Sequence, residues 1–182
     1  MSRTDARIRY TQGVLKQALL SFLQEKPINK ITVKEVCERA ELNRATFYTH
    51  YSDCFALLES IEEELLEAFQ QSLKLVDSFD VTALIEAIYT MIEQQQEACR
   101  VLIFQNVCPN VLRRMISLAR GKSIAYWKQH LHRVTDAELE MLYTHLSNGL
   151  MHVVVEGYEK YSREEVVRFV NRIVQCSLSQ FQ

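Results

Sequence analysis

Apolar residues recur at intervals of three and four along almost the whole chain, which is the period of one face of an α-helix. These stripes predict helices over residues 4–25, 53–72, 81–98, 109–132, 135–161 and 162–182, with a short apolar piece at 100–107 and a break at 77–80. The 182 residues include only 4 glycines and 2 prolines, which argues against β-hairpins and for long helices joined by short turns. The pattern therefore predicts an all-α fold.

Two shorter helices are predicted within residues 32–51 from their capping residues. Thr32 is followed three positions later by Glu35, the pair that forms a capping box at a helix N-terminus. Asn43 is a favourable N-cap for the second helix. Because only Glu41 and Leu42 separate the two, the joint is tight, as in a helix-turn-helix, whose second helix enters the DNA major groove.

The second of these helices is dense in hydrogen-bond donors for its length. Most of its residues can donate to phosphates or to base edges: Arg44, Thr46, Tyr48, Thr49 and His50. Phe47 and Tyr51 are four apart and are expected to face inward together. This composition favours a DNA-reading helix over the alternative, a polar surface helix that binds nothing.

The stretch ITVKEVCERAELNRATFYTHYSD resembles the DNA-binding domain of the TetR (tetracycline-repressor-like) regulators. The shared pattern is a Thr-capped helix, a short turn ending in Ser or Asn, a small residue, an aliphatic or Phe, Tyr, any residue, His, and Phe or Tyr. It covers about residues 8–65 closely. The resemblance implies a three-helix helix-turn-helix DNA-binding domain over 1–50. A helical ligand-binding and dimerisation domain over 51–182 would follow, with 53–72 as the connecting helix.

Two positions depart from the family pattern. Glu41 stands where the family usually has Gly, so a non-glycine residue is expected to adopt a left-handed conformation at about 1 kcal/mol. Cys54 stands where the family usually has Lys, which removes one expected phosphate contact.

Donor placement and the family motif together predict contacts to a double-stranded DNA operator. Thr32, Tyr48 and His50 are expected to hold phosphates, and Arg44, Ala45, Thr46 and Thr49 to face base edges, with Lys34 completing the set.

Residues 1–60 hold 9 Lys+Arg and 7 Asp+Glu, a balance of +2, whereas the remainder holds 12 and 16, a balance of −4. A slightly basic head on an acidic body suits a DNA reader attached to a second domain.

The last two predicted helices, which open with capping boxes at Thr135 and Ser162, have apolar faces broader than one neighbouring helix covers. In the resembling family, the final two helices of each chain pack into a four-helix dimer interface. We therefore expect a homodimer whose interface includes Leu142, Leu146, Gly149, Leu150, Val153, Val170, Ile173 and Val174. The alternative is that these faces are buried inside one chain.

Aromatic and polar-tipped side chains spread over the body are candidates for a ligand site, because such side chains typically line small-molecule pockets. The candidates are Tyr89, Phe104, Met115, Tyr126, Trp127, His130 and His152. Plain core packing is the alternative for each. The family resemblance implies an effector, either a small molecule or a protein, without identifying it.

Other chemistry finds little support. A Gly-rich phosphate loop and a G-x-S-x-G motif are both missing, so no enzyme and no cofactor are expected. His145, His152 and Glu156 are placed to share one helix face and could bind zinc, but polar groups facing a cavity or a partner helix are the simpler interpretation, so no metal is expected.

The cellular setting is expected to be cytoplasmic. No apolar run approaches the ~20 residues that span a bilayer, so no membrane partner is expected. The N-terminus is polar, and the five cysteines form no C-x-x-C pair, as is typical of reduced thiols in a cytosolic protein.

These observations predict a homodimeric DNA-binding transcriptional regulator, more specifically a ligand-responsive repressor. The alternative is a coactivator or signalling protein that keeps the fold but does not read DNA itself. Cys54 and the small +2 charge of the head are the features that favour this alternative.

Overall fold

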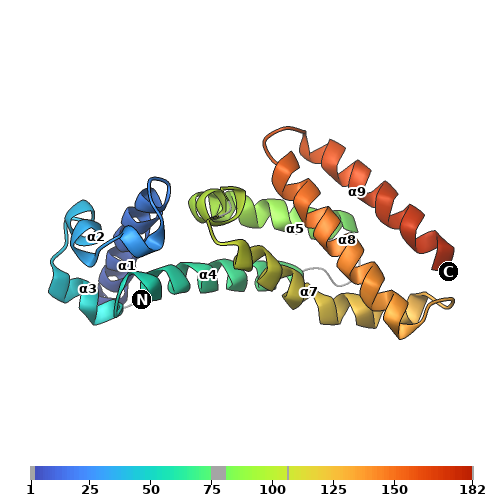
Figure 1. The fold of residues 1–182 in the computed structure, drawn as a ribbon, viewed down its shortest axis with the longest axis horizontal. Coiled ribbons are helices and arrows are strands. Elements are labelled where there is room, and N and C mark those ends of the chain that lie inside the picture. Colours follow the sequence, from blue (N-terminus) through green and yellow to red (C-terminus); the bar gives the residue numbers. More distant parts are fainter. Residues whose placement is uncertain (1–2, 75–80, 106, 182) are drawn as a thin grey trace. The chain divides into compact units, whose positions relative to one another are not determined.

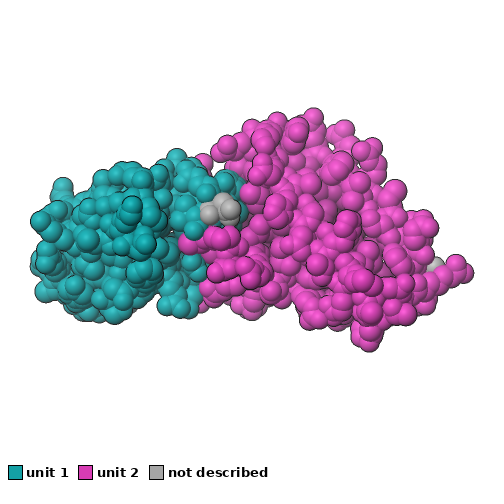
Figure 2. Space-filling model, in the orientation of Figure 1, with its two compact units in different colours: residues 1–65, 97–107 teal, residues 66–96, 108–182 magenta. Residues whose placement is uncertain are grey.

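The computed structural model describes residues 3–74, 81–105 and 107–181, and all the regular elements among them are helical (Figure 1). This confirms the predicted all-α fold; the break expected at 77–80 lies outside the described residues. The chain divides into two compact units (Figure 2). Unit 1 comprises residues 1–65 and 97–107, and unit 2 comprises residues 66–96 and 108–182.

Unit 1 begins with α1 (Arg3–Leu23), the short 3₁₀ turn η1 (Ile28–Lys30), α2 (Val33–Arg39) and α3 (Arg44–His50). Its core is formed by fully buried apolar side chains from each helix, among them Leu15, Leu19, Val36, Phe47 and Leu57. Arg39 fastens α2 to α1, because its guanidinium lies 3.7 Å from the centre of the Phe22 ring and donates a hydrogen bond of 2.7 Å to Ser21 Oγ.

The capping box at the start of α2 forms as its residues predict. The Thr32 amide donates to Glu35 Oε2 at 3.0 Å, and the Glu35 amide donates back to Thr32 Oγ1 at 3.3 Å. Hydrogen bonds from Lys26 and Thr32 lower the pKa of Glu35 to about 2, so the cap is charged at neutral pH. Glu41 has a φ of 54°, the left-handed conformation expected where the family has Gly.

Helix α4 (Cys54–Lys74) passes from unit 1 into unit 2 at residues 65–66. It begins where expected, because the Ala56 amide donates to Asp53 Oδ1 at 2.8 Å and so satisfies one of the unpaired amides of the first turn. The chain returns to unit 1 for residues 97–107, and then re-enters unit 2. The predicted functional boundary near residue 50 stays a prediction.

Unit 2 is built mainly from α5 (Val81–Gln94), α7 (Pro109–His130), α8 (Asp136–Gly157) and α9 (Arg163–Leu178). Helix α8 packs against α7 and α9, and α9 also packs against α5. Both predicted capping boxes of α8 and α9 are present. The final 3₁₀ turn η3 (Ser179–Phe181) is tied to the loop between α7 and α8, since the Phe181 carbonyl accepts from the His132 and Arg133 amides at 3.1 and 3.2 Å.

The structure differs from the sequence prediction at residues 81–98, which were expected to form one helix. Helix α5 ends at Gln94, the short α6 covers Gln96–Ala98, and a π-helical turn, η2, covers Cys99–Phe104. The amide of Gln105 donates to the Arg100 carbonyl five residues earlier at 3.0 Å, the spacing of a π-helix. Within this turn Cys99, Val101 and Leu102 are buried. Among the described helices, none is long and apolar enough to cross a membrane.

Candidate functional site

Helix α3 has one anchored face and one exposed face. Phe47 is 0% exposed, and its ring packs against Tyr51 with the ring centres 5.9 Å apart, as the four-residue spacing predicted. The opposite face carries the predicted DNA-reading side chains: Arg44, Ala45, Tyr48 and Thr49 are exposed, and Thr46 and His50 are half-buried. Tyr48 is 57% exposed although it is an aromatic residue. The predicted contact residues of α3 therefore lie together on the surface of a helix fixed by its core side.

The hydrogen bonds within α3 determine which donor, acceptor and methyl groups its side chains present to DNA. The Thr46 hydroxyl donates to Asn43 Oδ1 at 3.0 Å, and the Thr49 hydroxyl donates to the Ala45 carbonyl at 2.9 Å. Both threonines therefore present oxygen lone pairs and methyl groups, which suit base amino groups and the thymine methyl. Among the residues that the structure describes, Arg44 forms no ion pair, so its guanidinium remains available for a guanine edge or a phosphate.

The two predicted contact residues of α2 already have partners. The Thr32 hydroxyl donates to Glu35 Oε2 at 2.8 Å, so its first role is to cap α2. Lys34 lies 3.7 Å from Glu38 with both side chains mostly exposed, and such a pair is weak enough to exchange for a phosphate. Cys54 is 4% exposed and burial raises the pKa of its thiol to about 11, so this position supplies no cation to DNA.

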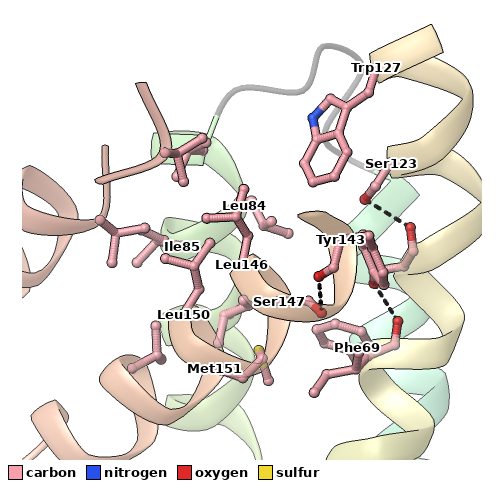
Figure 3. A pocket seen from close by; sticks show the side chains of 17 residues that line it. Phe69, Leu84, Ile85, Ser123, Trp127, Tyr143, Leu146, Ser147, Leu150 and Met151 are labelled. Carbon is pink, nitrogen blue, oxygen red and sulfur yellow. Dashed lines mark hydrogen bonds between the residues drawn. The ribbon is translucent and has the colours of Figure 1, made fainter. Parts of the chain in front are cut away.

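A second candidate site is an apolar cavity in unit 2 of about 70 Å³ (Figure 3). Its walls come from α5, α7, α8 and α9, together with Phe69 of α4. Of the seven ligand residues predicted from the sequence, only Trp127 lines it.

The other six candidates lie elsewhere and do not converge. Phe104 belongs to unit 1, and Met115 is buried away from the cavity. His130 is exposed and stacks on Tyr126 with ring centres 4.0 Å apart, and His152 is exposed beside the Asn148 carbonyl at 2.8 Å.

Tyr89, the last of the six, is buried in a separate cluster outside the cavity. Its ring packs against Tyr158, with the ring centres 5.3 Å apart, and lies 4.8 Å from the Arg163 guanidinium. Burial raises the pKa of its hydroxyl. Arg163 also forms ion pairs with Glu86 and Glu93 at 3.1 and 3.2 Å, so this cluster fastens the start of α9 to α5.

Serine residues on apolar helix faces, and not the aromatic residues chosen from the sequence, indicate where the cavity lies. Ser123 and Ser147 occur on otherwise apolar stripes of α7 and α8, and both line the cavity together with Tyr143. A serine on a core stripe marks a place where the packing leaves room for a small polar side chain. Apart from Phe69, Trp127 and Met151, the remaining lining residues are aliphatic and cannot be told from ordinary core by residue type.

The predicted dimer residues fall into two groups. Leu146, Val170 and Val174 are buried within one chain and line the cavity, so a partner chain would touch their neighbours instead. Gly149 and Ile173 are exposed, and Leu142, Leu150 and Val153 are half-buried. Phe169, four residues before Ile173 on α9, is 42% exposed.

The zinc alternative involved His145, His152 and Glu156 of α8. In the described part of the chain, no group of three or more His, Cys, Asp or Glu side chains is arranged to hold a metal ion.

Comparison with known proteins gives matches in both sequence and structure. No protein-family model matches the chain. A curated Bacillus subtilis (strain 168) protein, described as an uncharacterized HTH-type transcriptional regulator, YxbF, is 36% identical over 62 residues, which is 34% of this chain and 16% of that protein. The match thus spans a small part of the relative's length.

Solved structures match along nearly the whole chain. A TetR transcriptional regulator from Streptococcus agalactiae 2603V has a TM-score of 0.68 at 23% identity, covering 94% of this chain and 97% of that one. The TetR-family regulator PfmR from Thermus thermophilus has a TM-score of 0.61 at 14% identity, covering 89% and 97%. The dihydroxyacetone kinase operon activator DhaS has a TM-score of 0.53 at 17% identity, covering 94% and 98%. The chain therefore has the fold of the TetR-family transcriptional regulators, as its helix-turn-helix sequence predicted.

Proposed function

We propose that this protein is a TetR-type transcriptional regulator that reads operator DNA through α3. The observation that carries this proposal is the two-sided character of that helix. Phe47 fixes one face in the core of unit 1, while Arg44, Tyr48 and Thr49 stand exposed on the other face. A short helix that presents donors and acceptors from a rigid support has what base readout in the major groove requires.

The DNA-bound form is a homodimer in this proposal. Phe169 and Ile173 expose apolar surface on α9, and on α8 a Cβ added at Gly149 would meet no described atom within 4 Å. A second copy packed on this face would cover the apolar side chains and approach the α8 backbone closely. Two-fold pairing is also what operator recognition needs, because two recognition helices must sit about 34–36 Å apart to enter successive major grooves.

The proposed mode of regulation is repression that ends when a ligand fills the cavity of unit 2. Cavity walls come from α4, α5 and α7. Helix α4 continues into unit 1, and α5 and α7 flank the segment 97–107 that returns to unit 1. In this proposal, a ligand that reshapes the cavity acts on unit 1 mainly through α4, which contributes Phe69 to the wall.

Release by a ligand requires reciprocal coupling, because a ligand that weakens DNA binding must itself bind more weakly when DNA is present. The expected result is a lower affinity of any cavity ligand in the presence of saturating operator. Isothermal titration of the ligand into the protein, alone and with operator, measures this. Equal affinity in the two titrations would refute the release mechanism for that ligand while leaving DNA binding intact.

The alternative function, a coactivator or signalling protein that does not read DNA, is favoured by two observations. Cys54 is buried where a phosphate-binding lysine would be expected, and residues 1–60 carry a balance of only +2, from 9 Lys+Arg and 7 Asp+Glu. The comparison with an operon activator also leaves both repression and activation compatible with the fold.

Replacing Arg44 with alanine tests the proposed base contacts against Tyr48→Phe, which removes a proposed phosphate contact. Arg44→Ala is expected to weaken binding to a selected operator by about 1–3 kcal/mol with little effect on random DNA, because base contacts set sequence choice. Tyr48→Phe is expected to weaken binding to both DNAs about equally. Fluorescence anisotropy on the two DNAs measures both variants, and an equal loss on both DNAs for Arg44→Ala would overturn the assignment.

A further inference from the structure

The cavity of unit 2 is built without charge. All of its lining side chains are neutral, and most are aliphatic, such as Leu84, Ile85, Leu146 and Leu150 (Figure 3). A charged ligand group placed among them would lose its hydration without gaining an ion pair, which is strongly unfavourable in an apolar interior. The cavity wall therefore discriminates against charged ligands, and this discrimination is stronger than any selection by ligand shape.

The hydroxyl groups of the wall are already used by the helices that carry them. Ser123 donates to the Ala119 carbonyl at 3.0 Å, Tyr143 to the Ile116 carbonyl at 2.5 Å, and Ser147 to the Tyr143 carbonyl at 2.6 Å (Figure 3). Burial raises the pKa of Tyr143 to about 12, so its hydroxyl stays neutral. These groups keep the wall neutral and leave at most oxygen lone pairs facing a ligand.

The size of the cavity limits the ligand as well. A volume of about 70 Å³ is far below the roughly 300–1,000 Å³ of sites that hold drug-sized ligands. Flexible aliphatic side chains and Met151 border it, so small adjustments can enlarge it modestly. A single small ring or a short alkyl chain fits this description.

We propose that the cavity binds a small, neutral, hydrocarbon-rich molecule and discriminates against charged molecules of the same size. The proposal names the ligand class for the ligand-responsive function proposed above, and any role of this ligand in regulation rests on that function. The binding preference itself concerns unit 2 alone.

The chain supplies its own reporter of cavity filling. Trp127 is the single tryptophan of the sequence, it is buried, and it lines the cavity. Its fluorescence should therefore respond when a molecule enters.

The experiment titrates the full-length protein with toluene, benzoate and benzylammonium at neutral pH, following Trp127 fluorescence and the thermal unfolding midpoint. These three probes share one ring and differ in charge. Toluene is expected to change the fluorescence, to raise the midpoint, and to bind at least about tenfold more tightly than either ion, because the wall offers no charged partner. Benzoate or benzylammonium binding as tightly as toluene would overturn the proposal, as would no response to toluene. Neither result depends on any variant folding.

Ala119→Leu and Ala125→Leu form a matched pair on α7. Ala119 lines the cavity, whereas Ala125 is exposed on the same helix. Ala119→Leu should fill the cavity and reduce toluene affinity by about tenfold or more, while Ala125→Leu should leave it unchanged. Equal toluene binding by the wild type and both variants would place the probe elsewhere and refute the assignment. Because no DNA is present, failure here is separate from failure of the operator-binding assay.

Discussion

Replacing Phe47 with alanine is expected to lower the free energy of unfolding of the helix-turn-helix by about 3–5 kcal/mol. Phe47 is 0% exposed and its ring contacts those of Tyr48 and Tyr51, with ring centres 5.6 and 5.9 Å apart. Truncation removes this contact surface and leaves a cavity directly beneath the proposed DNA-reading face. The loss should appear as an earlier transition in urea unfolding followed by circular dichroism.

Tyr48→Ala is the matched control, since it removes the neighbouring aromatic ring from the exposed side of the same helix. Because Tyr48 is 57% exposed, its removal should cost no more than about 1.5 kcal/mol, the value of its edge-to-face contact with Phe47. DNA binding should fall in both variants, but for different reasons: Phe47→Ala disorders the support, and Tyr48→Ala removes a contact. If Phe47→Ala unfolded at the same urea concentration as the control, α3 would not be anchored as described.

Replacing Ile173 with arginine is expected to convert the proposed dimer into monomers. Ile173 is 37% exposed within an apolar patch of α9 that includes Phe169, so an arginine there leaves the single chain intact but places an unpaired charge at the contact. Binding to a two-half-site operator should fall by about 100-fold or more, because joining two half-site readers in one dimer is worth roughly 10²–10⁴ in avidity. Sedimentation velocity measures the first effect and anisotropy the second.

Gln175→Arg provides the control, since it adds the same charge two residues further along α9 at an exposed polar position. It should leave both the dimer and DNA binding unchanged. Val170 would be the wrong position for this test, because it is 0% exposed and an arginine there would disrupt the core of one chain. An Ile173→Arg protein that sediments as a dimer of undiminished strength would locate the interface elsewhere.

Features governed by local chemistry were predicted accurately from the sequence. The capping boxes at Thr32, Thr135 and Ser162 all form, because each depends on two side chains three residues apart. The inward pairing of Phe47 with Tyr51 follows in the same way from their four-residue spacing. The left-handed conformation of Glu41 was expected from the family resemblance, because the family usually has Gly at this position. These features also define the proposed DNA-reading helix, whose exposed residues were predicted from the placement of hydrogen-bond donors together with the family motif.

The ligand cavity could not be predicted in this way. Its walls are set by how four helices of unit 2 and Phe69 meet, and that packing depends on contacts between residues far apart in sequence. Choosing aromatic residues by type selected Tyr126 and His130, which stack on each other outside the cavity. The positions of Ser123 and Ser147 on the apolar faces of α7 and α8 indicated the cavity better than residue type did. They become informative only once these two apolar faces are known to face each other.

The dimer surface illustrates the same limit. A broad apolar face on α9 indicates that something covers it, but the sequence cannot divide the face between the inside of the chain and a partner. The structure makes that division: Val170 and Val174 pack inward, and Phe169 and Ile173 remain exposed. The proposed interface therefore shifts to the exposed side of the same helix.

The most direct test of DNA reading by this chain is a salt titration of the wild-type protein against DNA from around its own coding region, compared with random DNA of equal length. If Lys34 of both protomers neutralises phosphates, affinity should fall at least about tenfold between about 50 and 200 mM salt, since each phosphate neutralised adds about 0.9 to the logarithmic slope. The account predicts a saturable complex that prefers the specific DNA throughout this range. Absence of any complex at the lowest salt, or equal affinity for both DNAs, would contradict it and favour the coactivator alternative.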